Sequence, residues 1–157
     1  MQYQSIPSRS QLSLFEGFLA HNMASFSTLP LKDSESESER LSEMSLSGSS
    51  THCQLLLAPI LRDLSEAADS RWLTLIAPPS VLTQEWLKEN GLNRERILLL
   101  QPRGTHNALD LACKALMSGC SHTVISWLGK LDGATRQKLR AAARRGSAQS
   151  LNIRLGC

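Results

Sequence analysis

The turn after the apolar segment 72–77 is the feature that most limits what this chain can do. Residues 72–77 are typical of a buried strand, and Pro78 and Pro79 follow them directly, before a predicted helix. In α/β proteins such a turn often binds a nucleotide phosphate, through glycines whose backbone N–H groups converge on the anion. Proline has no N–H to donate. The sequence therefore predicts an α/β fold without a phosphate-binding loop, and it favours binding over catalysis.

Beyond residue 50, segments that predict strands alternate with segments that predict helices. We expect strands at 72–77, 96–101, 123–128 and 150–155, and helices at about 51–64, 81–90, 105–118 and 133–145. Pro59 should bend or delay the first helix. The apolar run 97–100 is typical of a strand covered on both faces, and helical crossovers join parallel strands. The sequence thus predicts an α/β domain with a small, mainly parallel sheet of about four strands, flanked by helices.

Serine dominates the first 50 residues, notably the runs 34–39 and 45–50. Such a segment buries too little apolar surface to offset the entropy that is lost on ordering. We therefore expect a mostly disordered arm over 1–50 and a folded domain over 51–157. On this division, deletion of residues 1–48 should leave the melting temperature nearly unchanged. Residues 12–20 could form a short amphipathic helix, with or without a binding role.

The composition indicates a cytoplasmic protein. The formal net charge is +3, too small by itself to indicate a polyanion-binding surface. No apolar run approaches the roughly 18 residues that span a bilayer, and the N-terminus lacks the layout of a signal peptide, so we expect no membrane partner. Cations nevertheless cluster late in the chain, at Arg136, Lys138, Arg140, Arg144, Arg145 and Arg154. This cluster leaves DNA binding open as an alternative.

The sequence lacks the patterns of catalysis and of metal binding. It has no Walker A sequence, no dinucleotide fingerprint, no G-x-S-x-G elbow and no H-E-x-x-H. Four residues could be assembled into a metal site, but their spacing matches no zinc pattern. They are His106, Cys113, Cys120 and His122. We therefore expect no metal, no cofactor and no enzymatic activity.

The carboxyl ends of the predicted strands favour a protein-docking surface, because functional contacts of open parallel sheets gather there. Those ends are residues 77–79, 101–104 and 128–130. Pro78 and Pro79 stiffen this edge and Arg103 makes it basic, so it suits an acidic or amphipathic loop of a partner.

The three tryptophans are expected to have different roles. Trp86, on the helix after the proline turn, is the candidate anchor of an interface, with half-buried packing as the alternative. Trp72 and Trp127 lie within strand patterns and are predicted to be core residues.

Five segments carry a resemblance to a known family. They are Gln54–Leu61, Ser70–Trp72, Leu82–Trp86, Gly91–Leu92 and Val124–Leu128. In order and separation they resemble SulA, the family of bacterial cell-division inhibitors that is induced in the SOS response to DNA damage. The likeness covers nearly all of the chain after residue 51.

The resemblance implies a RecA-like domain without a P-loop, and FtsZ, the tubulin-like GTPase of the division ring, as the partner. A tubulin-like GTPase completes its catalytic site when the next subunit inserts an acidic loop. An inhibitor on the polymerisation face would therefore block both assembly and GTP hydrolysis, and hence septation. The family positions implicated in inhibition match Arg71, Ile76, Trp86 and Arg96. Arg71 and Trp86 are the same residue types as in the family, whereas Arg96 replaces a Lys and Ile76 replaces a Leu.

Two departures and two alternatives accompany the resemblance. The arm over 1–50 shows no match to the family. The chain stops at Gly156-Cys157, where some relatives continue into a tail that the Lon protease recognises, so Lon is a possible partner that the sequence does not decide. The open edge of a small sheet allows a homodimer. The alternative function is that of a RecA-like accessory protein in DNA repair, with nucleic acid as the less favoured partner.

Overall fold

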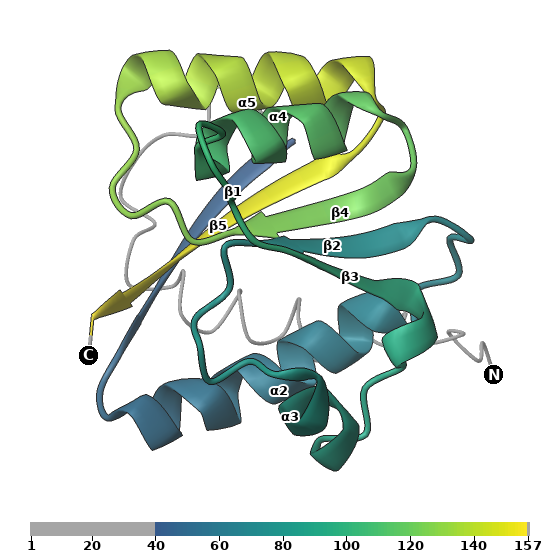
Figure 1. Ribbon diagram of the computed structural model, residues 1–157, viewed down its shortest axis with the longest axis vertical. Coiled ribbons are helices and arrows are strands. Elements are labelled where there is room, and N and C mark those ends of the chain that lie inside the picture. Colours follow the sequence, from purple (N-terminus) through teal and green to yellow (C-terminus); the bar gives the residue numbers. More distant parts are fainter. Residues whose placement is uncertain (1–39, 157) are drawn as a thin grey trace, which may run out of the picture. The chain divides into compact units, whose positions relative to one another are not determined.

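The computed structural model describes residues 40–156, and within them five strands form one fully parallel sheet (Figure 1). Their order across the sheet is β1-β5-β4-β2-β3. The strands are β1 (Leu41–Ser47), β2 (Trp72–Ile76), β3 (Ile97–Leu100), β4 (Ser121–Ser126) and β5 (Gln149–Gly156). The predicted α/β architecture and the four predicted strands are confirmed. The RecA-like assignment stays an expectation from the resemblance.

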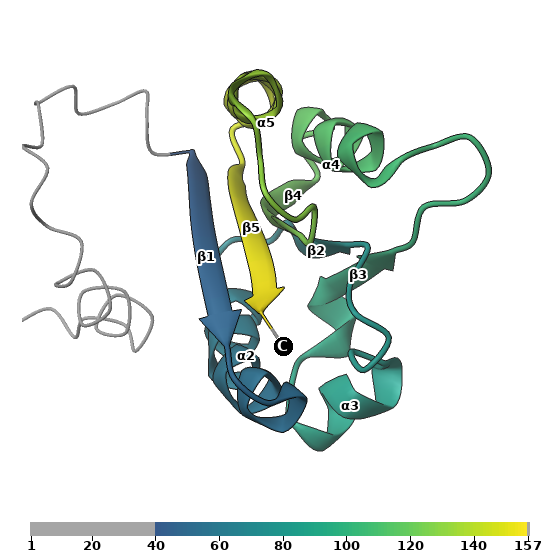
Figure 2. The same cartoon turned by 90° about the vertical axis from the view of Figure 1, so that its left-hand side faces the viewer.

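Helices cover both faces of the sheet (Figures 1 and 2). One face carries α2 (Ser50–Ser65) and α3 (Gln84–Glu89), and the other carries α4 (Ala108–Met117) and α5 (Gly133–Arg145). A short 3-10 turn, Arg94–Arg96, precedes β3. The sequence predicted all four helices, although α2 begins at Ser50 and runs through Pro59, so the expected delay is absent. No helix among residues 40–156 is long and apolar enough to cross a membrane.

The predicted boundary at residue 50 is wrong, because β1 lies inside the predicted arm. β1 pairs with β5 in register from Leu41 opposite Ser150 to Ser47 opposite Gly156. Met44 and Leu46 are buried, whereas Ser45 between them and Ser47 after them are exposed. In this period-two pattern the serines occupy the solvent side of an edge strand, which composition alone cannot distinguish from a disordered serine run. Residues 1–39, with the predicted amphipathic helix 12–20, lie outside the described residues.

Local signals position the helices that frame the sheet. Ser49, Thr83, Asn107 and Asp132 each accept a hydrogen bond from the backbone N–H three residues later, and so cap α2, α3, α4 and α5. Gly146 ends α5 beside the last turn of α4. A Cβ at this position would overlap the backbone carbonyl of Leu116, so only glycine fits there.

Candidate protein-docking surfaces

Strand direction separates the predicted contact residues into two groups. Arg71 and Arg96 precede β2 and β3 at the amino edge of the sheet, whereas Pro78, Pro79 and Arg103 follow the same strands at the carboxyl edge. β2 has five residues, so about 17 Å of strand lies between the two groups. The seven predicted residues therefore do not form one continuous surface along β2.

The other two predicted contact residues differ in accessibility. Ile76 is fully buried in the core between the sheet and the helices α4 and α5, so its side chain serves packing. Trp86 is half-buried on α3, which leaves part of its ring available to a partner.

At the amino edge, Asp69 organises the two arginines. The Arg71 Nη2 lies 2.7 Å from Asp69 Oδ2, and Arg71 Nη1 donates 3.0 Å to the carbonyl of Ser147. Arg96 Nη1 donates 2.8 Å to the Asp69 backbone carbonyl. Hydrogen bonds from Arg71 lower the pKa of Asp69 to about 2. Arg71 and Arg96 thus hold together the turns that lead into β2, β3 and β5.

His122 lies in the same cluster and should make stability depend on pH. Burial lowers its pKa below the ordinary 6.5; Arg71 and Arg96 add to this, and Asp69 opposes it. Because the folded pKa is depressed, the stabilisation is present above pH 6.5 and is lost as the pH falls through the folded pKa. We expect the free energy of unfolding to fall between about pH 7.5 and about pH 5, as measured by urea denaturation.

His122→Gln is the matched variant for this prediction. An amide can still bond to the Thr123 hydroxyl, which lies 2.9 Å from His122 Nδ1, but it does not titrate. The slope over this pH range should therefore flatten in the variant. An unchanged slope would assign the pH dependence to another group. Asp69 and Asp132 have pKa values below the ordinary 3.8 and lose their contributions only at lower pH.

The carboxyl edge contains the point where the connections of the sheet diverge. From β2 the chain passes through α3 to β3 on one side, and from β4 it passes through α5 to β5 on the other. The crevice between two such strand ends is the usual ligand position of open parallel sheets. Here it lies between residues 77–79, after β2, and residues 127–129, after β4.

The turn after β2 offers no N–H group to an anion from residues 77–79. The Ala77 N–H donates to the Leu100 carbonyl at 2.8 Å, and the two prolines have none. Pro78 is buried, and its carbonyl accepts from Gln101 Nε2 at 3.1 Å. Ala77 has a positive φ of 52°, which is strained for a residue with a Cβ. The geometry thus gives a rigid turn in place of a phosphate-binding loop.

Asn152, which the sequence analysis did not single out, holds the turn after β4. It is fully buried in β5, its Oδ1 accepts from the Leu128 N–H at 2.9 Å, and its Nδ2 donates to the Gly129 carbonyl at 2.8 Å. The sequence could have indicated this role, because Asn152 is a single polar residue between Leu151 and Ile153 in a predicted core strand, and a buried polar side chain needs hydrogen-bond partners.

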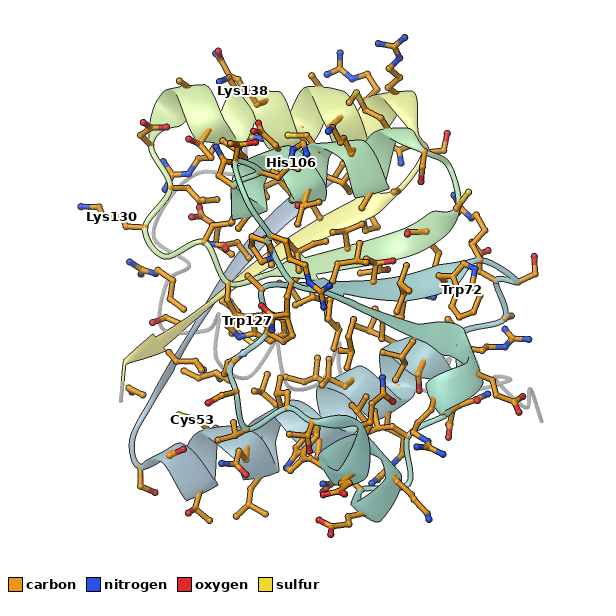
Figure 3. The ribbon with its side chains drawn as sticks, viewed as in Figure 1. Cys53, Trp72, His106, Trp127, Lys130 and Lys138 are labelled. Atoms are coloured by element: carbon orange, nitrogen blue, oxygen red, sulfur yellow. The ribbon has the colours of Figure 1, made fainter. Side chains whose placement is uncertain are left out.

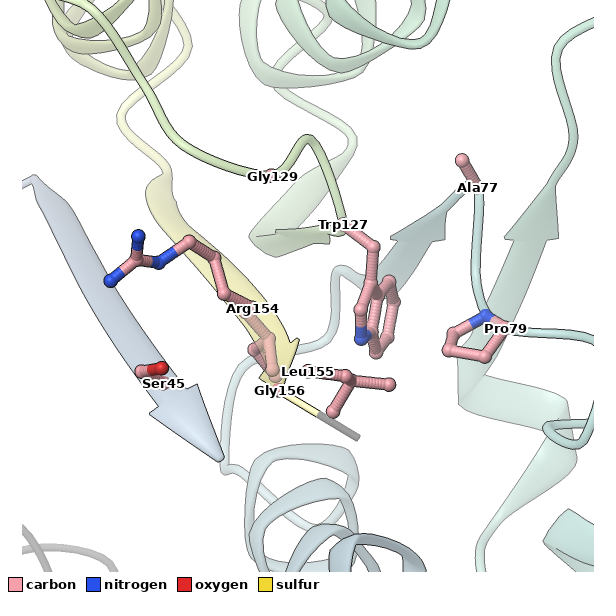
Figure 4. Close-up of a pocket in the computed structure, with 9 residues that line it drawn as sticks. Ser45, Ala77, Pro79, Trp127, Gly129, Arg154, Leu155 and Gly156 are labelled. Carbon is pink, nitrogen blue, oxygen red and sulfur yellow. The ribbon is translucent and has the colours of Figure 1, made fainter. Parts of the chain in front are cut away.

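Trp127 lines a pocket of about 550 Å³ at this edge, together with Ala77, Pro79, Gly129, Arg154 and Leu155 among others (Figure 4). Its ring lies between the ends of β5 and β2, with the indole nitrogen turned toward the end of β5. The Nε1 atom is buried and has no hydrogen-bond partner among the described residues.

The prediction that Trp72 is a core residue is wrong, and Trp127 is only half-buried. Trp72 is 42% exposed at the start of β2, and the two residues lie at opposite ends of the sheet (Figure 3). Each tryptophan is at or just beyond a strand end, where the covering helices no longer enclose the side chain. The strand pattern predicted their strands correctly but not their burial.

Within residues 40–156 no group of three or more metal-ligating side chains is close enough to hold an ion. Cys113 is half-buried on α4, and burial raises the pKa of its thiol. Its side chain packs against the core cluster that lies between the sheet and the helices α4 and α5.

Comparison with known proteins identifies the family. The family model described as "Cell division inhibitor SulA" matches residues 39–150. The chain belongs to the SulA family. A cell division inhibitor SulA of Pseudomonas aeruginosa is 57% identical over 157 aligned positions, and the match covers 97% of this chain and 97% of the relative. The SulA of Yersinia pestis is 32% identical over 122 residues, covering 78% of this chain and 71% of the relative.

The fold matches a SulA of known structure. The crystal structure of SulA from Pseudomonas aeruginosa has a TM-score of 0.71 and 63% sequence identity, and the match covers 74% of this chain and 98% of that one. The family match begins at residue 39, immediately before β1, and so includes the strand that the predicted boundary at residue 50 had left out of the domain.

Proposed function

We propose that this protein stops cell division by binding FtsZ at its polymerisation face, with no catalytic step of its own. Membership of the SulA cell-division inhibitor family carries this proposal. The rigid proline turn supports it, because the position where related α/β folds bind a nucleotide phosphate offers no N–H groups from residues 77–79. Synthesis in the SOS response and a cytoplasmic location belong to the same proposal.

The carboxyl edge is the docking surface that we favour. Pro79 and Arg103 are accessible there, and the cations Lys130 and Arg154 are exposed, so this edge complements an acidic loop. Two carboxylates are engaged elsewhere, since Glu43, which pairs with Asn152 in the sheet, has its Oε2 2.9 Å from Arg136 Nε, and Asp132 caps α5. A preformed basic edge binds a loop with little ordering cost.

Arg71 and Arg96 then act mainly through the turns that they hold. Both donate to groups of the chain itself, around Asp69. Trp86 remains a candidate anchor, because its half-buried ring is held on a short helix beside the 3-10 turn that carries Arg96. Under this proposal Arg71→Ala lowers the melting temperature together with inhibition, whereas a contact-only role would lower inhibition alone.

Sedimentation of FtsZ polymers with GTP is the decisive experiment. Equimolar protein should reduce the pelleted FtsZ and the GTPase rate in parallel, because the GTPase site is completed only between subunits. The protein by itself should show no micromolar ATP or GTP binding by calorimetry. Unchanged polymer mass and GTPase rate at a large excess of the protein would contradict the proposal.

The helix α5 favours DNA binding as the second candidate function. It carries five cations and no carboxylate, and one of the five, Arg136, pairs with Glu43. Fluorescence anisotropy with a labelled duplex, measured at increasing salt concentration, tests this function. Binding through DNA phosphates should weaken steeply as the salt concentration rises. Binding that survives at physiological ionic strength, with no effect on FtsZ, would favour the DNA-associated alternative.

A further inference from the structure

The helix α5 and the edge strand β1 together form a strongly basic side of the domain. α5 packs against β1 and β5 (Figure 2), and it carries five cations and no carboxylate. Arg136, Arg140 and Arg144 recur at four-residue intervals, so they lie on one side of the helix, over a length of about 12 Å. The Arg136 Nε lies 2.9 Å from Glu43 Oε2 of β1, which directs this side of α5 toward the edge strand.

Arg40 extends the row of arginines beyond the end of α5. Its Nη1 donates 3.4 Å to the carbonyl of Ala148, and its own carbonyl accepts from the Ser150 N–H at 2.7 Å. Arg40 and Arg140 are 100 positions apart in the sequence, and the pairing of β1 with β5 brings them to the same side of the domain. We call Arg40, Arg136, Arg140 and Arg144 the arginine band.

Much of the positive charge on this side is not compensated within the chain. Among residues 40–156, Glu43 pairs with Arg136, but no carboxylate forms an ion pair with Arg40 or Arg140. The acceptor of Arg40 is a neutral carbonyl, which leaves the charge of the guanidinium in place. Lys138 and Arg145 add two exposed cations on α5. Such a concentration of one sign of charge favours a polyanion as the ligand.

The chemistry of the arginine band and its surroundings favours DNA among the polyanions. Five of the six cations are arginines, and planar guanidinium groups suit phosphate oxygens. None of the exposed large apolar side chains of residues 40–156 lies on α5 or β1, so this side lacks groups that insert into a membrane or anchor a protein partner. Neither element contains an aromatic ring on which single-stranded bases could stack, which favours a duplex.

We propose that the arginine band binds the phosphate backbone of duplex DNA, independently of sequence, while the carboxyl edge of the sheet stays open to FtsZ. The band begins beside Glu43 and runs toward the start of β1, whereas residues 77–79 and 101–104 follow the ends of β2 and β3. This inference adds a second binding site to the proposed function, and only its statement about FtsZ rests on that function. In the alternative function, by contrast, DNA replaces FtsZ as the partner.

Fluorescence anisotropy with two labelled duplexes of unrelated sequence tests the arginine band. The full-length chain should bind both equally, with a Kd of about 10⁻⁴–10⁻⁶ M at physiological salt, as is usual for binding through phosphates. The double variant Arg40→Gln/Arg140→Gln should bind at least about tenfold more weakly, and the slope of log Kd against log salt concentration should fall by about two. Lys88→Gln/Arg94→Gln removes two exposed cations from and near α3, and this matched control should bind like the parent chain.

Melting curves should show that both double variants fold. If the loss of the Arg40 contact unfolds the first of them, Arg140→Gln alone takes its place, and the slope should then fall by about one. Equal binding by the band variant and the control would overturn the inference. Binding to vesicles of equal parts phosphatidylglycerol and phosphatidylcholine, with none to the duplexes, would overturn it in favour of a lipid ligand.

FtsZ inhibition separates failure of the arginine band from failure of the proposed function. The parent chain should inhibit FtsZ GTPase equally with and without saturating duplex, and Arg40→Gln/Arg140→Gln should inhibit like the parent. Relief of inhibition by the duplex would show that the two sites overlap, and it would overturn the inference. DNA binding that depends on the band, in a chain that does not inhibit FtsZ, would support the DNA site and refute the proposed function.

Discussion

A chain that begins at residue 49 is expected not to fold stably, whereas a chain that begins at residue 40 should melt like the full-length protein. The shorter chain lacks β1 and its parallel pairing with β5. It loses the burial of Met44 and Leu46, worth about 1.5–3 kcal/mol for each side chain, and it uncovers β5. Because a whole domain is stable by only about 5–15 kcal/mol, this loss is a large part of the total.

Circular dichroism melting of the two truncated chains checks this expectation. Equal melting temperatures would show that β1 contributes nothing and that the boundary predicted at residue 50 is energetically correct. The point variant Leu46→Ala gives a graded test and should cost about 2–5 kcal/mol, as expected for a truncated core leucine. Its control is Ser42→Ala, at an exposed position of the same strand.

Asn152→Leu should be the most damaging single substitution at the carboxyl edge. Leucine is branched at Cγ as asparagine is, but it is larger and offers neither donor nor acceptor, so the Leu128 N–H and the Gly129 carbonyl both lose their partner. Each unsatisfied backbone group costs about 1–3 kcal/mol, so we expect a loss of about 4 kcal/mol in total. FtsZ inhibition should fall further than stability explains, because the turn that carries Trp127 is no longer held.

Ser150→Ala is the matched control for this substitution. Ser150 is also buried in β5, two residues from Asn152, but its hydroxyl has no hydrogen-bond partner among the described residues. Its removal should change the free energy of unfolding little in urea denaturation. If the asparagine and serine variants unfold at the same urea concentration, Asn152 does not hold the turn as described.

Several features were predictable because they depend on neighbours in the sequence. The helix Gly133–Arg145 was predicted with its observed bounds, since Asp132 caps its start and Gly146 follows its end. The parallel sheet followed from apolar strands separated by helices of crossover length. Pro78 and Pro79 excluded a glycine-rich phosphate loop whatever the fold around them, because proline lacks the donor.

Other features depend on residues that are far apart in the sequence and meet only in the folded chain. β1 is a strand because its backbone pairs with that of β5, which lies more than 100 residues later in the sequence. The serines of β1 carry no local signal that distinguishes this pairing from disorder. Similarly, the burial of Trp72 and Trp127 depends on where the helices stop covering the sheet, which strand periodicity does not encode.

The sequence alone determined the α/β class, the family resemblance and the turn after β2 that cannot bind a phosphate, because these follow from residue types and short spacings. Tertiary structure decided how the predicted contact residues are distributed. It put Arg71 and Arg96 around Asp69 at one edge, buried Ile76, and brought Trp127, Arg154 and Pro79 to one pocket at the other edge. The physical reason is strand order, because β5 and β2 are the two neighbours of β4 in the parallel sheet. Their carboxyl ends therefore lie on either side of the end of β4, although Ala77 and Arg154 are 77 positions apart in the sequence, and Pro79 and Asn152 are 73 positions apart.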